Sequence, residues 1–311
     1  GQLTLPKTEE LSNTGFESNT TGWTAASNNS PGTGNVISWW ALDETSGIRS
    51  DSHGSYDLTD NNTVLYGTGK QSNAADFEQS SIEYLSSANA SWQSMPQERT
   101  ITGWVNPESL PATTTFWIIS KYVTNVGGRE FGIGYQAGTD NGWRVLMWDS
   151  SATIFELTSG TDNASTGEWY HFAFVYERST TFKLYINGSE VDSDTAPASE
   201  ESNYSFPLYV GAANVPSTSS AWDGLIDELT ILDSALTPDE ITFLYNSGNG
   251  RAYSDLTPSV TRDTGTTYNS SSGSGKVVGN GNTTLLQSVN VGDTNAYNLV
   301  SYVYTDGTAV T

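Results

Sequence analysis

The chain has no cysteine and only two histidines, His53 and His171. The lack of cysteine excludes disulfides, thiolate zinc sites and cysteine nucleophiles. Two histidines leave little material for Ser–His catalytic arrangements or for histidine metal sites. The sequence also contains no run of about 18 apolar residues, so we expect no membrane-spanning helix. Most enzyme classes that depend on these side chains are therefore disfavoured from the outset.

Basic residues are scarce as well, with 12 Lys and Arg against 35 Asp and Glu and a net charge of −23. Such a surface repels phosphate backbones, so we expect no nucleic-acid partner. The excess of carboxylates suits divalent cations and an extracellular setting, and triplets such as Asn187-Gly188-Ser189 permit glycosylation there. The start at Gly1, without an apolar leader, is expected of a chain whose signal peptide has been removed. We predict a location outside the cell or at its surface.

Aromatic residues are abundant, with 10 Trp and 16 Tyr, in a background rich in Gly, Ser, Thr and Asn. Aromatic and β-branched residues alternate with polar ones in segments separated by turn residues, which is the pattern of β-strands. These segments are 100–106, 116–122, 130–135, 143–149, 169–176 and 182–187. Asn187-Gly188 is a strong signal for a two-residue hairpin turn. With no helical pattern between the segments, the fold class is all-β, an antiparallel β-sandwich.

One helix is predicted at about 238–247. Thr237 is placed to cap its N-terminus, Glu240 completes a capping box, and Gly248 follows as the expected terminator. Ile241, Leu244 and Tyr245 share one face of this helix. We interpret it as a structural element rather than a functional one.

Separated motifs along the chain resemble, in their order, those of laminin-G-like, concanavalin A-like jelly rolls. They are residues 40–44, 75–77, 102–105, 168–173, 184–188 and 224–231, and the helix start at 235–241 follows them. The resemblance covers roughly residues 36–250. It implies an antiparallel jelly-roll sandwich that binds glycans or cell-surface proteins.

The two ends of the chain resemble a different jelly roll. Residues 13–24 are similar to the first strand of carbohydrate-binding modules of the family 4/22 type, whose fold is galactose-binding-like. Residues 272–278, 286–291 and 297–304 are similar to later strands of that fold. We therefore predict a nested arrangement, with a laminin-G-like domain at 35–250 inserted into a split β-sandwich formed by 1–34 and 251–311.

The outer sandwich has fewer strands than a complete jelly roll requires. One interpretation is a truncated piece of a longer chain. The other is strand sharing between subunits, in which residues 2–5 or the 297–304 strand complete a neighbouring copy. On that second interpretation the chain forms a homo-polymer through its open sheet edges.

Catalytic carboxylates are not apparent in the sequence. Glycan-cleaving enzymes of the family that the chain resembles carry a Glu-x-Asp-x-x-Glu motif. Its spacing places an acid and a nucleophile on the same face of one strand. Residues 190–194 begin such a run but lack its final Glu, and they follow a hairpin turn. His171 lies among core aromatics, without a partner serine. We therefore predict that the chain is not an enzyme.

Calcium is the cofactor that the resemblance implies. The ion takes six to eight oxygen ligands, which acidic loops of a β-sandwich supply without a linear motif. In the concanavalin A-like fold, Asp43 or Glu44 would meet Asp227, with Asp51 as a further ligand. In the outer module, the matching calcium ligand is Glu17. The alternative is that these carboxylates cap turns or pair with Arg49 and Lys276.

A sugar-binding surface is predicted at 143–149, where alternation places Arg144, Leu146 and Trp148 on one face of a strand. If that face is exposed, Arg144 and Trp148, together with Tyr135 and Trp143, would form a platform for a glycan. A core role for Trp148 is the alternative.

These observations predict an extracellular, non-enzymatic carbohydrate-binding or adhesion protein, whose partner is a glycan or a cell-surface protein. The competing hypothesis is a structural subunit of a surface filament or sheath that assembles by strand sharing.

Overall fold

The structure is a computed structural model. It describes residues 30–256, except 94–96, 113, 123–128, 138–141, 161–163, 200–204 and 214–216, together with the backbone of four strands between 259 and 304. Two compact units are present. One is Pro31–Tyr253, and the other contains the four strands after residue 258.

An eight-stranded antiparallel sheet forms one layer of the larger unit. In spatial order its strands are β13 (Ser189–Asp194), β12 (Thr181–Ile186), β11 (Tyr170–Glu177), β6 (Glu98–Pro107), β15 (Gly224–Leu232), β4 (Asn73–Phe77) and β3 (Leu65–Thr68), while β1 (Val36–Trp40) also pairs with β15. The first and last strands of the unit are therefore neighbours in one sheet.

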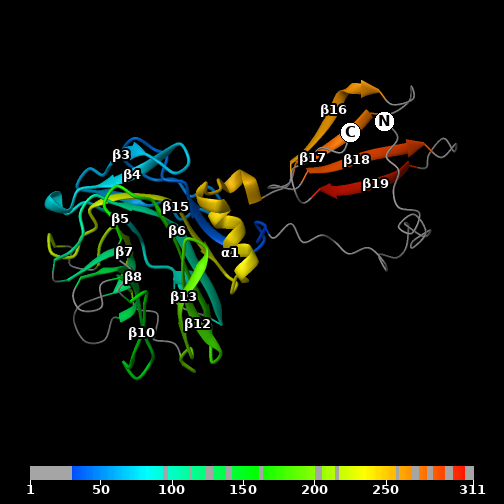
Figure 1. The fold of residues 1–311 in the computed structure, drawn as a ribbon. Coiled ribbons are helices and arrows are strands. Elements are labelled where there is room, and N and C mark those ends of the chain that lie inside the picture. Colours follow the sequence, from blue (N-terminus) through cyan, green and yellow to red (C-terminus); the bar gives the residue numbers. More distant parts are fainter. Residues whose placement is uncertain are drawn as a thin grey trace. The chain divides into compact units, whose positions relative to one another are not determined.

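A seven-stranded antiparallel sheet forms the second layer, and Figure 1 shows the two layers face to face. Its spatial order is β10 (Ile154–Thr158), β9 (Gly142–Trp148), β8 (Arg129–Gln136), β7 (Thr115–Tyr122), β14 (Leu208–Val210), β5 (Tyr84–Ser87) and β2 (Thr59–Asn61). The all-β sandwich predicted from the alternating pattern is confirmed. Each of the six predicted strands is present, with bounds within two residues of the prediction.

The core lies between the two sheets, because alternate residues of the central strands point inward. On β11 these are Phe172, Phe174 and Tyr176, which are fully buried in the main apolar cluster. The hairpin from β12 to β13 turns at Asn187 and Gly188, both with positive φ (50° and 78°), as a two-residue turn of this type requires.

The α-helix α1 (Pro238–Tyr245) has the predicted capping box, in which Thr237 and Glu240 bond reciprocally to each other's backbone N–H. Tyr245 stacks on Trp104 of β6, so the helix covers the outer face of the eight-stranded sheet (Figure 1). Its predicted end at Gly248 is wrong. The helix ends at Tyr245, because Asn246 adopts the left-handed conformation (φ 49°) and donates its N–H to the carbonyl of Thr242.

Four short 3-10 helices complete the regular structure described between residues 30 and 256. They are η1 (Gln79–Ser81), η2 (Ser91–Gln93), η3 (Asn246–Gly248) and η4 (Tyr253–Leu256). None of the helices in the described residues has the length and hydropathy needed to cross a membrane.

The second unit contains a four-stranded antiparallel sheet, ordered as the strands occur in the chain. The strands are β16 (Ser259–Thr267), β17 (Gly273–Val278), β18 (Thr283–Asn290) and β19 (Tyr297–Tyr304). Residues 1–29, on which the split sandwich and the strand exchange depend, lie outside the described residues, as does 305–311. The nested arrangement and strand sharing therefore stay predictions.

Candidate binding pocket

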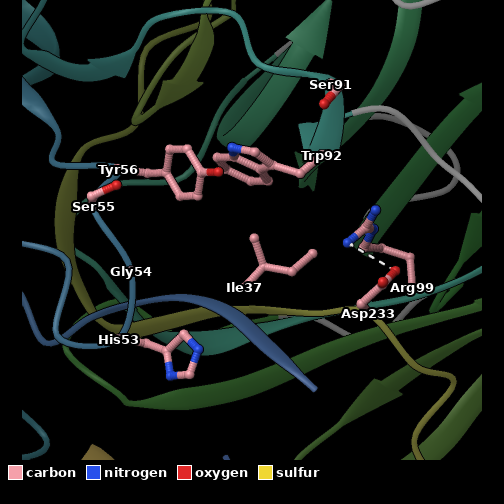
Figure 2. Close-up of a pocket in the computed structure, with 9 residues that line it drawn as sticks. All are labelled: Ile37, His53, Gly54, Ser55, Tyr56, Ser91, Trp92, Arg99 and Asp233. Carbon is pink, nitrogen blue, oxygen red and sulfur yellow. Dashed lines mark ion pairs between the residues drawn. The ribbon is translucent and has the colours of Figure 1, made fainter. Parts of the chain in front are cut away.

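A cavity of about 560 Å³ opens at one edge of the sandwich, where β1, η2, the start of β6 and the end of β15 meet. This volume is within the roughly 300–1,000 Å³ of typical small-ligand sites. The lining residues are Ile37, His53, Gly54, Ser55, Tyr56, Ser91, Trp92, Arg99 and Asp233. Figure 2 shows Ile37 between a pair of aromatic rings on one side and the Arg99–Asp233 ion pair on the other.

One carboxylate, that of Asp51, holds the loop that forms a wall of the pocket. Its Oδ1 accepts hydrogen bonds from the backbone N–H groups of Trp39 and His53, both at 3.0 Å. Its Oδ2 accepts a third, from the N–H of Tyr56 at 3.1 Å. Bonds from N–H groups to a charged acceptor are stronger than neutral ones, so they fix the loop against β1.

Gly54 allows this loop to pass close to β1. A Cβ atom at this position would lie 2.7 Å from Oδ2 of Asp51 and 2.9 Å from the carbonyl oxygen of Ile37. Both atoms are held in place by the loop and the strand. A larger residue at position 54 would therefore push the loop away from β1 and change the pocket.

Two aromatic side chains, Tyr56 and Trp92, form the apolar wall. Their ring centroids are 4.7 Å apart with the rings tilted by 45°, and both side chains are partly exposed. Buried Trp40 supports them from the core, because its indole N–H donates to the carbonyl oxygen of Tyr56 at 2.8 Å and its ring lies 6.3 Å from that of Trp92. The wall is thus fixed before any ligand arrives.

The polar side of the pocket is the pair Arg99 and Asp233. Nη1 of Arg99 lies 3.6 Å from Oδ1 of Asp233, and the side chains are 4% and 62% exposed. The guanidinium therefore has a fixed direction while the carboxylate faces solvent. Together they present hydrogen-bond donors and acceptors beside the aromatic wall.

The predicted platform residues are divided between the two faces of the seven-stranded sheet. Arg144, Leu146 and Trp148 do share the outer face, as alternation predicts. Tyr135 and Trp143 point the other way, into the core between the sheets, where they are 3% and 1% exposed. They cannot join a surface on the outer face, because the pleat of β8 and β9 places them on the opposite side.

Trp148 itself is 3% exposed and packs in a small apolar cluster with Trp117, Leu146 and Ala213. Tyr122 lies against both indoles, with ring centroids 5.6 Å from Trp117 and 5.1 Å from Trp148. Arg144 is held by Glu156 of β10, with Nε and Oε1 2.7 Å apart. Nε1 of Trp148 is buried with no hydrogen-bond partner among the described residues. A sugar-binding role for Arg144 and Trp148 stays a prediction.

Of the predicted calcium ligands, Asp227 on β15 is fully buried. Its Oδ2 accepts the backbone N–H groups of Lys70 and Gln71, whereas its Oδ1 is buried with no hydrogen-bond partner among the described residues. Burial raises the pKa of Asp227 to about 7, and the nearby charge of Asp43 adds to the rise while the N–H bonds oppose it. Asp43 is thus near enough to act on Asp227 electrostatically, and a shared calcium ion at these two residues stays a prediction.

The other predicted ligands have different surroundings. Glu44 accepts the N–H of Ser50 at 2.8 Å and interacts electrostatically with buried Arg49, and Asp51 organises the pocket loop. Glu17 lies outside the described residues. Three carboxylates with oxygens mutually within 4.8 Å occur elsewhere in the described part of the chain, at Asp76, Glu78 and Glu108.

The residues weighed as catalytic in the sequence have structural surroundings. His171 is buried, its Nε2 lies 2.9 Å from Oγ1 of Thr102, and burial lowers its pKa to about 3, so it is neutral. Glu190 lies on the exposed edge strand β13, where its Oε2 pairs with Nζ of Lys183 at 2.9 Å. Residues 190–194 thus belong to a mostly exposed strand.

Sequence reasoning missed Tyr56, Trp92, Arg99 and Asp233 as a group. A usable signal was present for the two aromatics, because both occur in polar loop segments that do not alternate. An aromatic residue outside a strand pattern has no core position assigned to it and is a candidate for ligand contact. Arg99 and Asp233 carried no comparable signal.

Comparison with protein families finds one matching model, described as the concanavalin A-like lectin/glucanases superfamily, over residues 79–242. The match spans more than half of the chain and includes strands of both sheets. None of the curated proteins matches the chain.

Solved structures with a similar fold include domain 4 of AbnA, a GH43 extracellular arabinanase from Geobacillus stearothermophilus, in complex with arabinotriose. It is 23% identical, with a TM-score of 0.53 over 67% of this chain and 97% of that one. The binding domain of Paraclostridial Mosquitocidal Protein 1 is 16% identical, with a TM-score of 0.55 over 89% and 69%. The ligand-binding domain of botulinum neurotoxin serotype D, in complex with N-acetylneuraminic acid, is 12% identical, with a TM-score of 0.55 over 88% and 70%. Such likenesses show the fold.

Proposed function

The chain belongs to the concanavalin A-like lectin/glucanases superfamily, and from this premise we propose that it is a non-enzymatic carbohydrate-binding protein acting outside the cell or at its surface. The AbnA domain was solved with arabinotriose and the neurotoxin domain with N-acetylneuraminic acid, and both complexes support binding of a saccharide on this fold. Because a fold hosts many functions, the proposal depends on the site in this chain.

The observation that carries the proposal is the pocket with Tyr56 and Trp92 on one side and Arg99 and Asp233 on the other. Sugar rings have apolar C–H faces that pack on aromatic rings, and their hydroxyls need both donors and acceptors. The pocket supplies these two features at opposite sides, and Asp51 holds the loop that carries Tyr56 in place without a ligand. Such preorganisation lowers the entropy cost of binding.

The residues that line the pocket also explain why we propose binding rather than hydrolysis of a glycan. Hydrolysis of a glycosidic bond needs two carboxyl groups about 5–9.5 Å apart that flank the bond. Among the described residues that line the pocket, Asp233 is the one carboxylate. We therefore assign the pocket to binding.

The proposal is tested by retention of the protein on immobilised polysaccharides, with Trp92→Ala as the variant. We expect at least one polysaccharide to retain the protein and the variant to lose affinity by about tenfold or more, since the ring supplies much of the contact area. Tyr66→Ala on the exposed edge strand β3 is the matched control, because it removes a partly exposed aromatic outside the pocket. Trp92→Phe keeps a ring and should retain part of the affinity. A protein that no polysaccharide retains would contradict the proposal.

We also propose that calcium stabilises the larger unit at Asp227 and Asp43. The buried Oδ1 of Asp227, which has no hydrogen-bond partner among the described residues, is what a hard cation would fit, with Asp43 as a second carboxylate. A cation there would fasten β15 to the 70–71 segment, whose N–H groups Asp227 already binds.

Thermal unfolding with and without a chelator tests the calcium proposal. Because an ion that binds only the folded state stabilises that state, we expect a lower Tm in the presence of the chelator. Asp227→Asn should abolish the dependence on calcium. The same Tm in both solutions, with no metal found by elemental analysis, would rule this ion out.

A further inference from the structure

Resting on the proposed function, we infer that the pocket takes an uncharged sugar residue, recognised by one apolar ring face and two neighbouring hydroxyls, and that it discriminates against sugar acids. The two sides of the pocket carry this inference. One is the aromatic pair Tyr56 and Trp92, and the other is the ion pair Arg99 and Asp233 (Figure 2).

The charge of the pocket is balanced. Among its nine lining residues, Arg99 is the one Lys or Arg side chain and Asp233 the one Asp or Glu. A sugar carboxylate that approached Arg99 would lie next to Asp233, which is about 3.6 Å from the guanidinium. Repulsion between the two carboxylates would offset the attraction to Arg99.

The electrostatic field of the whole chain also disfavours sugar acids. The net charge of −23 lowers the local concentration of anionic ligands and leaves that of neutral ligands unaffected. An uncharged sugar meets no such penalty.

The geometry of the ion pair favours a pair of hydroxyls on adjacent carbons. Arg99 is almost fully buried and offers N–H donors in one direction, while the exposed carboxylate of Asp233 offers acceptors beside them. Each hydroxyl of a vicinal pair is both a donor and an acceptor, so one can accept from Arg99 while the other donates to Asp233. Hydrogen bonds to charged groups make this recognition stronger than contacts with neutral side chains.

The opposite wall fixes the orientation of the ring. Trp92 and Tyr56 are partly exposed and are tilted by 45° to each other, and Ile37 adds an aliphatic contact between the walls. A pyranose or furanose that lies with one face on these rings directs its edge hydroxyls toward Arg99 and Asp233. The aromatic wall thus contacts the ring face of a sugar residue, and the ion pair contacts its hydroxyls.

The experiment measures binding of the full chain to neutral polysaccharides (arabinan, xylan, mannan and β-glucan) and to acidic polygalacturonate, by affinity electrophoresis and by calorimetry with the matching oligosaccharides. The variants are Asp233→Ala and, as a control that removes the same charge from an exposed ion pair, Glu190→Ala. Because Asp233 is the partner of the nearly buried Arg99, its removal can lower Tm, so binding is compared at a temperature at which thermal unfolding shows all variants to be folded. We expect a neutral polysaccharide to bind, Asp233→Ala to weaken that binding by about tenfold or more, and Glu190→Ala to leave it unchanged.

Three results would overturn the inference, and they separate it from the proposed function. Preferential binding of polygalacturonate that Trp92→Ala removes would leave carbohydrate binding in place and refute the preference for uncharged sugars. Binding of a neutral polysaccharide that is the same in Asp233→Ala would refute the role of the ion pair. Binding of none of the polysaccharides would refute the proposed function together with the inference.

Discussion

Two regions of the sandwich carry the same kinds of side chain but differ in how deeply these side chains are buried. The pocket combines the aromatic pair Tyr56 and Trp92 with an Arg–carboxylate pair. The outer face of the seven-stranded sheet also combines aromatic rings with an Arg–carboxylate pair, Arg144 and Glu156. The sequence drew attention to the second region, whereas the structure places a cavity at the first.

The difference lies in the exposure of the aromatic rings, in the spacing of the ion pairs and in the presence of a cavity. On the sheet face, Nε of Arg144 is 2.7 Å from Oε1 of Glu156, and the indoles of Trp117 and Trp148 are buried against neighbouring side chains. In the pocket, Nη1 of Arg99 is 3.6 Å from Oδ1 of Asp233, and the rings are partly exposed beside a cavity. Side-chain types alone therefore do not identify a binding site. A cavity beside partly exposed rings, as at Tyr56 and Trp92, is a better indication of one.

Of the substitutions that distinguish these two regions, Trp148→Ala is expected to have the largest effect on stability. Because Trp148 is packed in an apolar cluster, truncating it should lower the free energy of unfolding by about 3–5 kcal/mol, as measured by urea denaturation. Affinity for a polysaccharide, measured where the variant is still folded, should be unchanged. If Trp148→Ala instead abolished retention and kept its stability, the sheet face would be the binding surface and the comparison would be reversed.

A smaller effect is expected from Gly132→Ala on β8. The new Cβ would lie 2.5 Å from Cζ3 of Trp117, whose ring packs over this glycine on the outer face. Overpacking of this kind should lower the free energy of unfolding by about 1–3 kcal/mol, with no change in polysaccharide affinity. Gly34→Ala is the control, since nothing lies within 4 Å of its new Cβ. Equal stability of the two variants would show that the aromatic cluster on this face is loosely packed.

The smallest effect is expected from Glu156→Ala. Its ion pair with Arg144 is partly exposed, so its loss should change the free energy of unfolding by about 0–1 kcal/mol, less at high salt. Calorimetry should find the affinity for a neutral oligosaccharide unchanged, in contrast to Asp233→Ala. A loss of affinity equal to that of Asp233→Ala would mean that both ion pairs contact the ligand.

The fold was predictable because its signals are local. Alternation on β11 and β12 gave the strands and their inward faces, and the Asn187-Gly188 turn gave the hairpin between them. The capping box of α1 was visible as Thr237 and Glu240 three residues apart, but its end was not, because Asn as well as Gly adopts the left-handed conformation.

The pocket was not predictable in the same way, because its walls come from segments far apart in the chain. Tyr56 and Asp233 are brought together by β1 and β15 pairing in one sheet, which no local pattern specifies. Alternation correctly placed Trp148 on one face of β9 with Arg144 and Leu146, but a period of two gives neither which face is outward nor the depth of burial. Tyr135 and Trp143 were grouped with it on residue type, against that same alternation.

The way Asp51 holds the pocket loop has a consequence for how this site could be redesigned. The loop keeps its path through bonds from main-chain N–H groups, so the side chain of Ser55 is not part of that scaffold. The ring of His53 makes one further contact, because its Nδ1 lies 2.8 Å from the hydroxyl of Tyr253. New side chains at these two positions would alter what the cavity accepts while the frame beneath them persists. A library varied at 53 and 55, with Asp51 and Gly54 kept, is therefore a direct route to variants with an altered ligand preference.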